Sequence, residues 1–499
     1  MTVVTARTVD PAEVLDRAIK SLKMLDTPLP LEDVDRALKL VPSDARLWHV
    51  KGLIHREQER RDLAIPALKR ATELAPSEPL IAHGYARTLL EAGLPSVDAF
   101  GRALKLAPNN PDVTRGLVAS LSAIGRSAEA LAGLETVLRR SPLWTEGHVL
   151  LANLRWAEGE REGFTRSFEE ALAQHPNSLE LRREQLAALL EAEHFEEVFS
   201  RVAEGRRMFG DHILFSSHEV AALSESGNIA EADPLFSQLA ELNFSNIDMW
   251  RVRHLIRAGR PDEASSVIDR WLGSSDEDLF WAYAATAWRM TGDSRSDWLE
   301  GDQRFVGVYD ITDKLPAMDR LADTLRRLHV SKSQFFGQSV RGGTQTDGHL
   351  FQRIEPEIVA LRDAVRSVVA EHAAQLPAVD PRHPLLRWRP KQVDFNGAWS
   401  VRLVGGGNHA NHVHPMGWLS SAFYVVLPDD FGKDKAGWLT LGEPQAQLGV
   451  GVQPHRFIEP KPGTLALFPS WMWHGTRKFD EGERITVAFD VAAGRAPGS

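Results

Sequence analysis

Three histidines and one arginine near the C-terminus have the residue types and spacing of a metal-dependent active site. His412 and His414 form a His-x-His pair, His474 follows 60 residues later, and Arg484 lies ten positions beyond it. If the pair lies on a β-strand, both imidazoles point to one face, about 7 Å apart at the backbone. With His474 they would converge on one ion. Imidazole binds Fe(II) and Zn(II) alike, and three ligands leave coordination positions open for other molecules.

Arg484 and Thr486 have the spacing of a carboxylate-binding pair. They stand two residues apart at the start of the last predicted strand, so their side chains share one face. An arginine fork grips a carboxylate through two parallel hydrogen bonds, and a neighbouring hydroxyl adds a third. Tyr424, on the strand expected after the His-x-His pair, could reach the same group. These residues predict a site for the distal carboxylate of a 2-oxo diacid that chelates the metal.

Short β-type runs predict the fold that would position these residues. Turns containing glycine, proline and aspartate separate the runs. The predicted strands are Trp399–Val404, Trp418–Leu427, Gly437–Leu441, Thr464–Phe468 and Ile485–Val491. Several short strands at this spacing are typical of a β-sandwich or jelly roll.

Two further segments stand upstream of these strands. Residues 355–376 predict an amphipathic helix. Residues 341–346 predict a polar loop with two glycines, for which two interpretations are open. The loop is either a turn between domains or a part of the substrate cleft, lined by Arg341 and Gln345. Trp471 and Trp473 are expected to pack in the core rather than to stack on a substrate.

The first three fifths of the chain repeat with a period near 34 residues. Prolines that follow helical patterns stand at Pro42, Pro76, Pro108, Pro142 and Pro176, with separations of 34, 32, 34 and 34. This period, with small and large residues at fixed places such as Gly52 and Leu68, resembles tetratricopeptide repeats. The repeats are clear over 42–176 and degenerate over 177–300. Stacked repeats form an α-superhelix whose groove often holds an extended peptide, although a passive scaffold or dimerisation arm is the alternative.

The C-terminal part carries a second resemblance. Its motifs are His412–Val425, Phe468–His474 and Glu483–Asp490, with Arg341–Thr346 upstream. Over residues 331–499 they resemble bacterial 2-oxoglutarate/Fe(II)-dependent oxygenases. The resemblance implies a double-stranded β-helix core that binds Fe(II), uses 2-oxoglutarate and O2 as cosubstrates, and releases succinate and CO2. The usual outcome is hydroxylation of a substrate C–H bond.

The ligand set departs from the commonest one in this superfamily, which is His-x-Asp with a distal histidine. His414 stands at the aspartate position, and three neutral ligands leave the ion its full +2 charge. Two alternatives stay open: His409 is a ligand instead, or Glu443 or Asp394 supplies a carboxylate from elsewhere in the fold. A cupin site is disfavoured because Trp418, which cannot bind a metal, occupies the position of its glutamate.

The composition limits other functions. The 499 residues include no cysteine, which excludes disulfides, thiolate nucleophiles, iron–sulfur clusters and thiolate zinc sites. A net charge of −10 argues against nucleic acid as a partner. No apolar run is long enough for a membrane span, and residues 1–7 lack the pattern of a secretion signal. We therefore expect a cytoplasmic protein with no membrane partner.

Together these features predict a multidomain α plus β protein, with a tetratricopeptide-repeat superhelix over 1–330 and a jelly-roll oxygenase domain over 331–499. We expect it to hydroxylate an amino-acid side chain of a peptide or protein held by the repeat groove, which is oversized for a small metabolite. Two alternatives remain. One is a repeat-based adaptor with an inactive core, which the His414 departure motivates. The other is a small-molecule oxygenase that uses its repeats for oligomerisation. The oligomeric state is not predicted.

Overall fold

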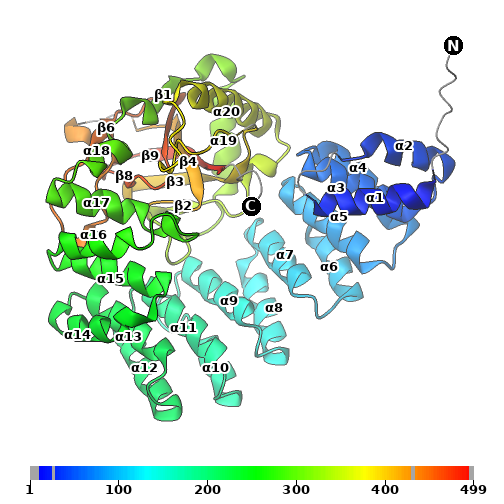
Figure 1. The fold of residues 1–499 in the computed structure, drawn as a ribbon. Helices are drawn as coiled ribbons and strands as arrows, with labels where there is room; N and C mark the ends of the chain where they lie inside the picture. Colours follow the sequence, from blue (N-terminus) through cyan, green and yellow to red (C-terminus); the bar gives the residue numbers. More distant parts are fainter. Residues whose placement is uncertain (1–9, 25–28, 391, 429–432, 494–499) are drawn as a thin grey trace. The chain divides into compact units, whose positions relative to one another are not determined.

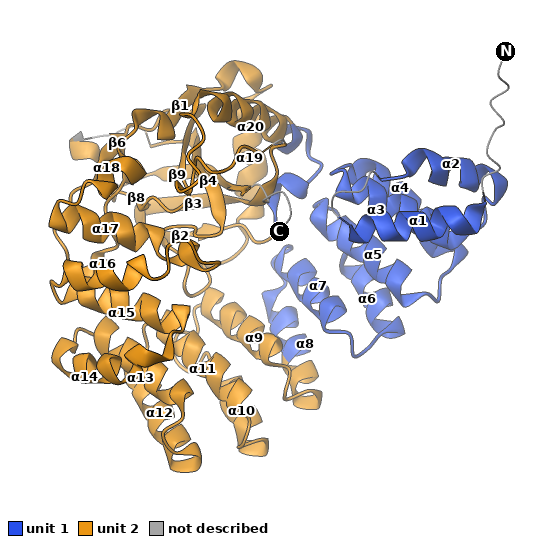
Figure 2. Cartoon of the chain, viewed as in Figure 1, with its two compact units in different colours: residues 1–134, 349–359 blue, residues 135–348, 360–499 orange. Residues whose placement is uncertain are grey.

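The computed structural model describes residues 10–24, 29–390, 392–428 and 433–493. The chain divides into two compact units, of which the first holds residues 1–134 and 349–359 and the second holds 135–348 and 360–499 (Figure 2). The segment considered for a secretion signal, residues 1–7, lies outside the described residues. Among the described residues, the helices are all too short or too polar to cross a membrane.

Within each unit, most successive helices of the N-terminal part of the chain pack against one another (Figure 1). In chain order they are α1 (Pro11–Lys23), α2 (Leu31–Leu40), α3 (Ala45–Glu57), α4 (Arg61–Leu74), α5 (Pro79–Glu91), α6 (Val97–Leu106), α7 (Pro111–Ser122), α8 (Ser127–Arg140), α9 (Thr145–Ala157), α10 (Arg166–Gln174), α11 (Leu179–Glu191), α12 (Phe195–Phe209), α13 (Ile213–Glu225), α14 (Ile229–Leu239), α15 (Ser245–Arg257), α16 (Pro261–Asp269), α17 (Trp281–Thr291) and α18 (Arg295–Glu300). From α9 onward these helices belong to the second unit.

The predicted helical repeats are confirmed, and local packing explains their pattern. Each of the five periodic prolines stands two residues after the end of a helix, namely α2, α4, α6, α8 and α10. Proline has no N–H to continue a helix. Within the pair α3 and α4, a Cβ at Gly52 would collide with the side chain of Leu68. A small residue on one helix therefore makes room for a large one on the next.

The turns inside helix pairs use one residue with a left-handed backbone. Gly227 and Gly259 take this role with φ of 89° and 72°. Glu193 takes it between α11 and α12 with φ of 61°. Because a side chain in this conformation costs about 1–2 kcal/mol, the glutamate at 193 is held at some expense of stability.

Two antiparallel sheets form the C-terminal part of the second unit (Figure 1). The larger has the order β1-β7-β4-β9-β3-β2 and the smaller the order β6-β5-β8. The strands are β1 (Gly307–Asp310), β2 (Val340–Gln345), β3 (Phe395–His409), β4 (Gly417–Val426), β5 (Leu439–Leu441), β6 (Arg456–Ile458), β7 (Thr464–Pro469), β8 (His474–Thr476) and β9 (Glu483–Ala492). Leu439 and Ile458 of the small sheet pack with Phe468 of the large one. This fold fits the predicted jelly-roll oxygenase core.

The flanking helices are α19 (Met318–Leu328) and α20 (Pro356–Gln375), and the second agrees with the amphipathic helix predicted at 355–376. One element differs from its prediction. Residues 341–346, predicted as a loop, lie mostly in the edge strand β2, which pairs with β3 across a bulge between Arg341 and Gly343. Glycine has little intrinsic strand preference, so pairing with β3 makes this segment a strand. The large sheet also takes in β1, upstream of residue 331.

Candidate metal and cosubstrate site

His412, His414 and His474 converge in one cavity. Their candidate ligand nitrogens all lie within 4.8 Å of one another. The ring centroids of His412 and His474 are 4.2 Å apart, and each lies 5.0 Å from that of His414. Among the described residues, no other set of three histidine, aspartate or glutamate side chains forms such a group.

Backbone pairing between segments, rather than strand alternation, brings these side chains together. His412 and His414 do not lie on a strand, the case considered from the sequence, because both fall between β3 and β4, where His412 makes a single bridge to His474. The N–H of His412 donates to the carbonyl of His474 at 2.9 Å, and the N–H of His474 donates back at 3.0 Å. The N–H of His414 donates to the carbonyl of Ser470 at 2.9 Å. Pro415 follows and has no N–H with which to continue a ladder.

Each of the three imidazoles is oriented through its Nδ1 atom. Nδ1 of His412 lies 2.8 Å from the carbonyl oxygen of Ala410, and Nδ1 of His474 lies 2.9 Å from that of Met472. Nδ1 of His414 lies 2.7 Å from a carboxylate oxygen of Asp490. An acceptor at Nδ1 places the proton there and leaves Nε2 as the basic nitrogen, which is how metal-binding histidines are commonly held.

Asp490 is a carboxylate beside the three histidines that the sequence analysis did not single out. It lies on β9, and it also accepts a hydrogen bond of 2.6 Å from the hydroxyl of Ser420 on β4. The carboxylate contacts the ring of His414 on its Nδ1 side, so its negative charge reaches the open Nε2 through the imidazole. The sequence did offer a signal for it: Asp490 stands an even number of residues after Arg484 and Thr486, so the three side chains share one face of β9.

Burial keeps the two innermost imidazoles neutral. It lowers the pKa of His412 to about 3, helped by the nearby ring of His414. It also holds the pKa of His474 well below the ordinary value, again with a contribution from neighbouring histidines. A neutral imidazole is the form that binds a metal, so these rings are ready to act as ligands near pH 7.

The alternative ligands weighed from the sequence are engaged elsewhere. His409 stacks on His412 with a centroid distance of 5.7 Å, and its Nδ1 lies 3.1 Å from the hydroxyl of Ser339. Glu443 pairs with Arg477 at 3.2 Å. The Asp394 carboxylate accepts from the side chain of Gln392 at 3.1 Å. None of the three stands in the converging group.

Arg484, Thr486 and Tyr424 form a second buried cluster. Arg484 and Thr486 alternate on β9, and Tyr424 on β4 is the direct cross-strand partner of Thr486. The guanidinium carbon of Arg484 lies 5.4 Å from the centroid of the Tyr424 ring. Burial raises the pKa of Tyr424 to about 12, against the opposing effect of the Arg484 charge. The phenol is therefore a hydrogen-bond donor at neutral pH.

This cluster fits a carboxylate ligand. Arg484 is only 2% exposed, yet its Nε has no hydrogen-bond partner among the described residues. The hydroxyl of Tyr424 is also buried, with only the Arg484 guanidinium beside it among them. A buried cation without a counter-ion costs several kcal/mol, and a bound carboxylate would accept from both groups and offset that cost.

The histidines and Arg484 share one cavity of about 560 Å³. That volume lies in the range of small-molecule and cofactor sites. Alternate residues of β9, from Arg484 to Asp490, line its floor, and Arg341 and Gln345 of β2 line it as well. Another wall comes from the repeats, through residues of α11, α12, α13 and α15. The repeats thus contribute directly to the cavity that holds the three histidines.

Helix α17 of the repeats also contacts Trp473, the residue that precedes the candidate ligand His474. The indole N–H of Trp473 donates to the carbonyl of Ala282 at 3.0 Å and to the hydroxyl of Thr286 at 2.9 Å, both on α17. Its ring meets Tyr283 edge-on with a centroid distance of 5.6 Å. Trp473 is thus a packing residue. Because His474 follows it directly, α17 helps to position the imidazole of His474.

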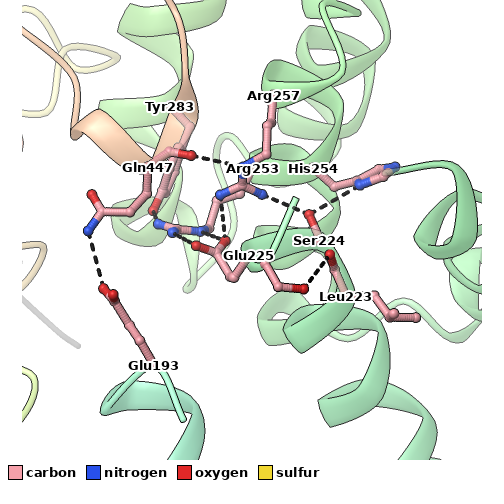
Figure 3. Close-up of polar contacts among 10 residues, drawn as sticks. Glu193, Leu223, Ser224, Glu225, Arg253, His254, Arg257, Tyr283 and Gln447 are labelled. Atoms are coloured by element: carbon pink, nitrogen blue, oxygen red, sulfur yellow. Dashed lines mark hydrogen bonds and ion pairs between the residues drawn. The ribbon is translucent and has the colours of Figure 1, made fainter. Parts of the chain in front are cut away.

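A polar network joins the repeats to the core beside the cavity (Figure 3). Glu225 of α13 accepts two hydrogen bonds from Arg253 of α15, at 2.8 and 2.6 Å. Arg253 also donates to the hydroxyl of Tyr283 at 2.9 Å. Arg257 donates to the backbone carbonyl of Gln447, in the loop that follows β5, at 2.8 Å. The α13–α17 helices therefore hold this loop of the core.

Comparison with known families agrees with both resemblances. Residues 397–490 match the family described as "Putative 2OG-Fe(II) oxygenase", and residues 45–78 match a tetratricopeptide repeat. The first match runs from β3 to Asp490 and so includes the three histidines and Arg484. The chain therefore carries tetratricopeptide repeats and a domain of the 2-oxoglutarate/Fe(II) oxygenase type.

Several solved structures resemble parts of the chain. MamA is 17% identical, with 33% of this chain and 92% of that chain covered and a TM-score of 0.30. The Pseudomonas aeruginosa pilF protein is 17% identical, with 41% and 94% covered and a TM-score of 0.31. A tetratricopeptide repeat protein of Parabacteroides merdae is 12% identical, with 49% and 98% covered and a TM-score of 0.32. No curated protein matches the chain.

Proposed function

We propose that this protein is a 2-oxoglutarate/Fe(II)-dependent dioxygenase that hydroxylates an amino-acid side chain of a peptide or protein. The observation that carries the proposal is one cavity with two matching binding sites. Three imidazoles converge there, with only the Ser339 hydroxyl beside the Nε2 of His412, and a buried guanidinium without a counter-ion lies in the same cavity. A metal-chelated 2-oxo diacid is the ligand that would engage both.

The roles of the residues follow from their contacts. His412, His414 and His474 would hold Fe(II) through Nε2, and Asp490 would orient and polarise the ring of His414. Arg484, Thr486 and Tyr424 would bind the distal carboxylate of 2-oxoglutarate. When bound, iron and 2-oxoglutarate supply the activation of O2 that C–H hydroxylation requires. The buried, apolar flank of the cavity, with Phe468 and Leu439, would exclude bulk water from the reacting groups.

The repeat wall supports a peptide or protein substrate. Tetratricopeptide repeats serve protein–protein contacts, and here their helices α11 to α15 form part of the cavity itself. An extended chain lying along these helices would reach the three histidines without leaving the repeats. The rival reading as an inactive adaptor accounts less well for Arg484, because a buried guanidinium without a ligand only destabilises the fold.

The direct test is an anaerobic titration of the full-length protein with Fe(II), with and without 2-oxoglutarate. We expect the weak visible charge-transfer band of a chelated 2-oxo acid in the wild type and its loss in His474→Ala. His409→Ala is the matched control, since this histidine lies beside the group but outside it, and the band should persist. Metal content near zero, or a band that survives in His474→Ala, would overturn the proposal.

A further inference from the structure

The repeat wall of the cavity is rich in negative charge. Three glutamates of the repeats line it: Glu191 at the end of α11, Glu193 in the turn that follows, and Glu225 at the end of α13. Whether they attract a cation depends on which of them already have a positive partner within the protein.

Glu225 is neutralised by the protein's own arginines (Figure 3). It accepts two hydrogen bonds from Arg253 and forms a further ion pair of 2.9 Å with Arg257. All three side chains are about nine-tenths buried or more. With both carboxylate oxygens occupied, Glu225 serves the junction between repeats and core and has no capacity left for a substrate.

Glu193 has a neutral partner only. One of its carboxylate oxygens accepts a hydrogen bond of 3.2 Å from the side-chain amide of Gln447, as Figure 3 shows. An amide satisfies an oxygen but brings no positive charge. The negative charge of Glu193 is therefore uncompensated at the rim of the cavity, although the left-handed backbone at this position disfavours any side chain.

Glu191 has no cationic partner among the described residues. Burial in the cavity wall raises the pKa of its carboxyl, and no neighbouring charge acts against that effect. Its carboxylate lies against the backbone of Gly337, where any Cβ would collide with it. The residue as a whole is exposed, with its carboxylate against Gly337, and an unpaired carboxylate in this position is available to bind a cation from outside.

The position of Gly337 places this charge close to the three histidines. Ser339 stands two residues further on, and its hydroxyl lies 3.2 Å from Nε2 of His412. Two residues of extended chain span at most about 7 Å. Phe336 anchors the same segment in the aromatic core of the repeats. Glu191 therefore lines the same cavity as the three histidines, at a separation that neighbouring residues of an extended peptide could span.

The cations of the cavity do not cancel these two charges. Arg253 is paired with Glu225, and Arg484 is the cation of the proposed 2-oxoglutarate site. Arg341 keeps its charge, because its partners are the backbone carbonyls of Gln338 and Val340, but it stands on β2 of the core and not on the repeat wall. The repeat side of the cavity therefore presents a net negative surface made of Glu191 and Glu193.

We propose that Glu191 and Glu193 bind a cationic side chain, lysine or arginine, of the peptide substrate. This inference rests on the proposed function and specifies its substrate class. The ammonium or guanidinium group lies on the modified residue itself or on a neighbour of it. The repeats thereby determine specificity, and the core performs the chemistry.

The test uses full-length protein and fluorescent peptide pools of random sequence with one fixed central residue. Pools with central lysine, arginine, glutamine or glutamate are compared by anisotropy without turnover, and free spermidine and lysine are added as competitors. We expect the lysine and arginine pools to bind roughly five- to tenfold more tightly than the glutamine pool, with a preference that weakens at high salt. Competition by spermidine alone would assign the site to a free amine and overturn the peptide proposal.

The double variant Glu191→Gln/Glu193→Gln should abolish the preference, since glutamine keeps the acceptor for Gln447 but removes the charge. Glu196→Gln is the matched control, because this exposed glutamate of α12 carries the same charge but lies outside the cavity lining. Equal binding of all pools, or tightest binding of the glutamate pool, would overturn the inference.

Failure of this inference is separable from failure of the proposed function. If the Fe(II)/2-oxoglutarate band forms but the pools bind alike, the enzyme class stands and the substrate class is wrong. If the basic pools bind through Glu191 and Glu193 but no band forms, the cleft recognises cationic peptides without oxygenase chemistry.

Discussion

The contact between Asp490 and His414 makes the third ligand of the set testable. Asp490→Asn removes the carboxylate charge but keeps an oxygen that can accept from Nδ1 of His414 and from Ser420, now at 2.7 and 2.6 Å. The ring should therefore keep its orientation. Only the electrostatic support of the open Nε2 is lost.

The size of the effect follows from the geometry. The carboxylate oxygen lies 2.7 Å from Nδ1, and the width of the ring puts Nε2 about 5 Å from it. A unit charge at about 5 Å with an effective dielectric constant of about 20 contributes about 3 kcal/mol before solvation is counted. Partners of this kind typically change metal affinity about 10- to 100-fold, or about 1.4–2.7 kcal/mol. We expect a loss of Fe(II) affinity in that range.

The assay is anaerobic equilibrium dialysis against Fe(II) for the wild type, Asp490→Asn and the control Asp394→Asn. The control removes the same charge from a carboxylate bonded to Gln392 and should stay within about twofold of the wild type. In a His414→Ala background, Asp490→Asn should have little further effect, because both act on one ligand. Unchanged affinity, or an equal loss in both backgrounds, would refute His414 as the third ligand.

Other consequences of the structure can be tested separately. His414→Asp alone would place a second carboxylate beside Asp490, so we expect activity to recover only with Asp490→Asn added, as measured by succinate release. Arg484→Lys should weaken 2-oxoglutarate binding roughly tenfold or more through loss of the bidentate fork, with Fe(II) affinity unchanged, in the same anaerobic titration. Trp473→Phe loses the hydrogen bonds to α17. We expect urea unfolding to show a free energy of unfolding lower by about 1–2 kcal/mol, and we expect a lower affinity for Fe(II). If neither quantity changes, α17 does not support the metal site through Trp473. Burial lowers the pKa of His383 to about 4, below its unfolded value of about 6.5. The neutral His383 therefore contributes its full stabilisation above pH 6.5, and the free energy of unfolding should fall by about 1.4 kcal/mol per pH unit between pH 6.5 and pH 4. Urea unfolding at several pH values measures this slope, and His383→Gln should remove it.

Local sequence patterns predicted the elements whose formation depends on local chemistry. The strand expected at Thr464–Phe468 is β7 (Thr464–Pro469), and the helix expected at 355–376 is α20. Both follow from runs of residues with one dominant preference. The proline period likewise marked the helix ends, because a missing N–H acts wherever the residue stands.

Elements that depend on a distant partner were not predictable in this way. The segment at Arg341 became β2 because β3 offers it hydrogen bonds, against the preference of its glycines. The link between Asp490 and His414 joins residues 76 positions apart and requires β9 and the segment after β3 to lie side by side. No spacing rule within one strand contains that information.

The sequence by itself determined the repeat class and singled out the candidate metal and carboxylate residues on which the proposed reaction type rests, since residue types and periods carry that information directly. Only the tertiary structure decided which carboxylate supports His414, that α17 holds Trp473 beside His474, and that Glu191 and Glu193 of the repeats line the cavity of the core. These are relations between surfaces far apart in the chain. They exist only after burial of apolar area has brought the repeats and the sheets into contact.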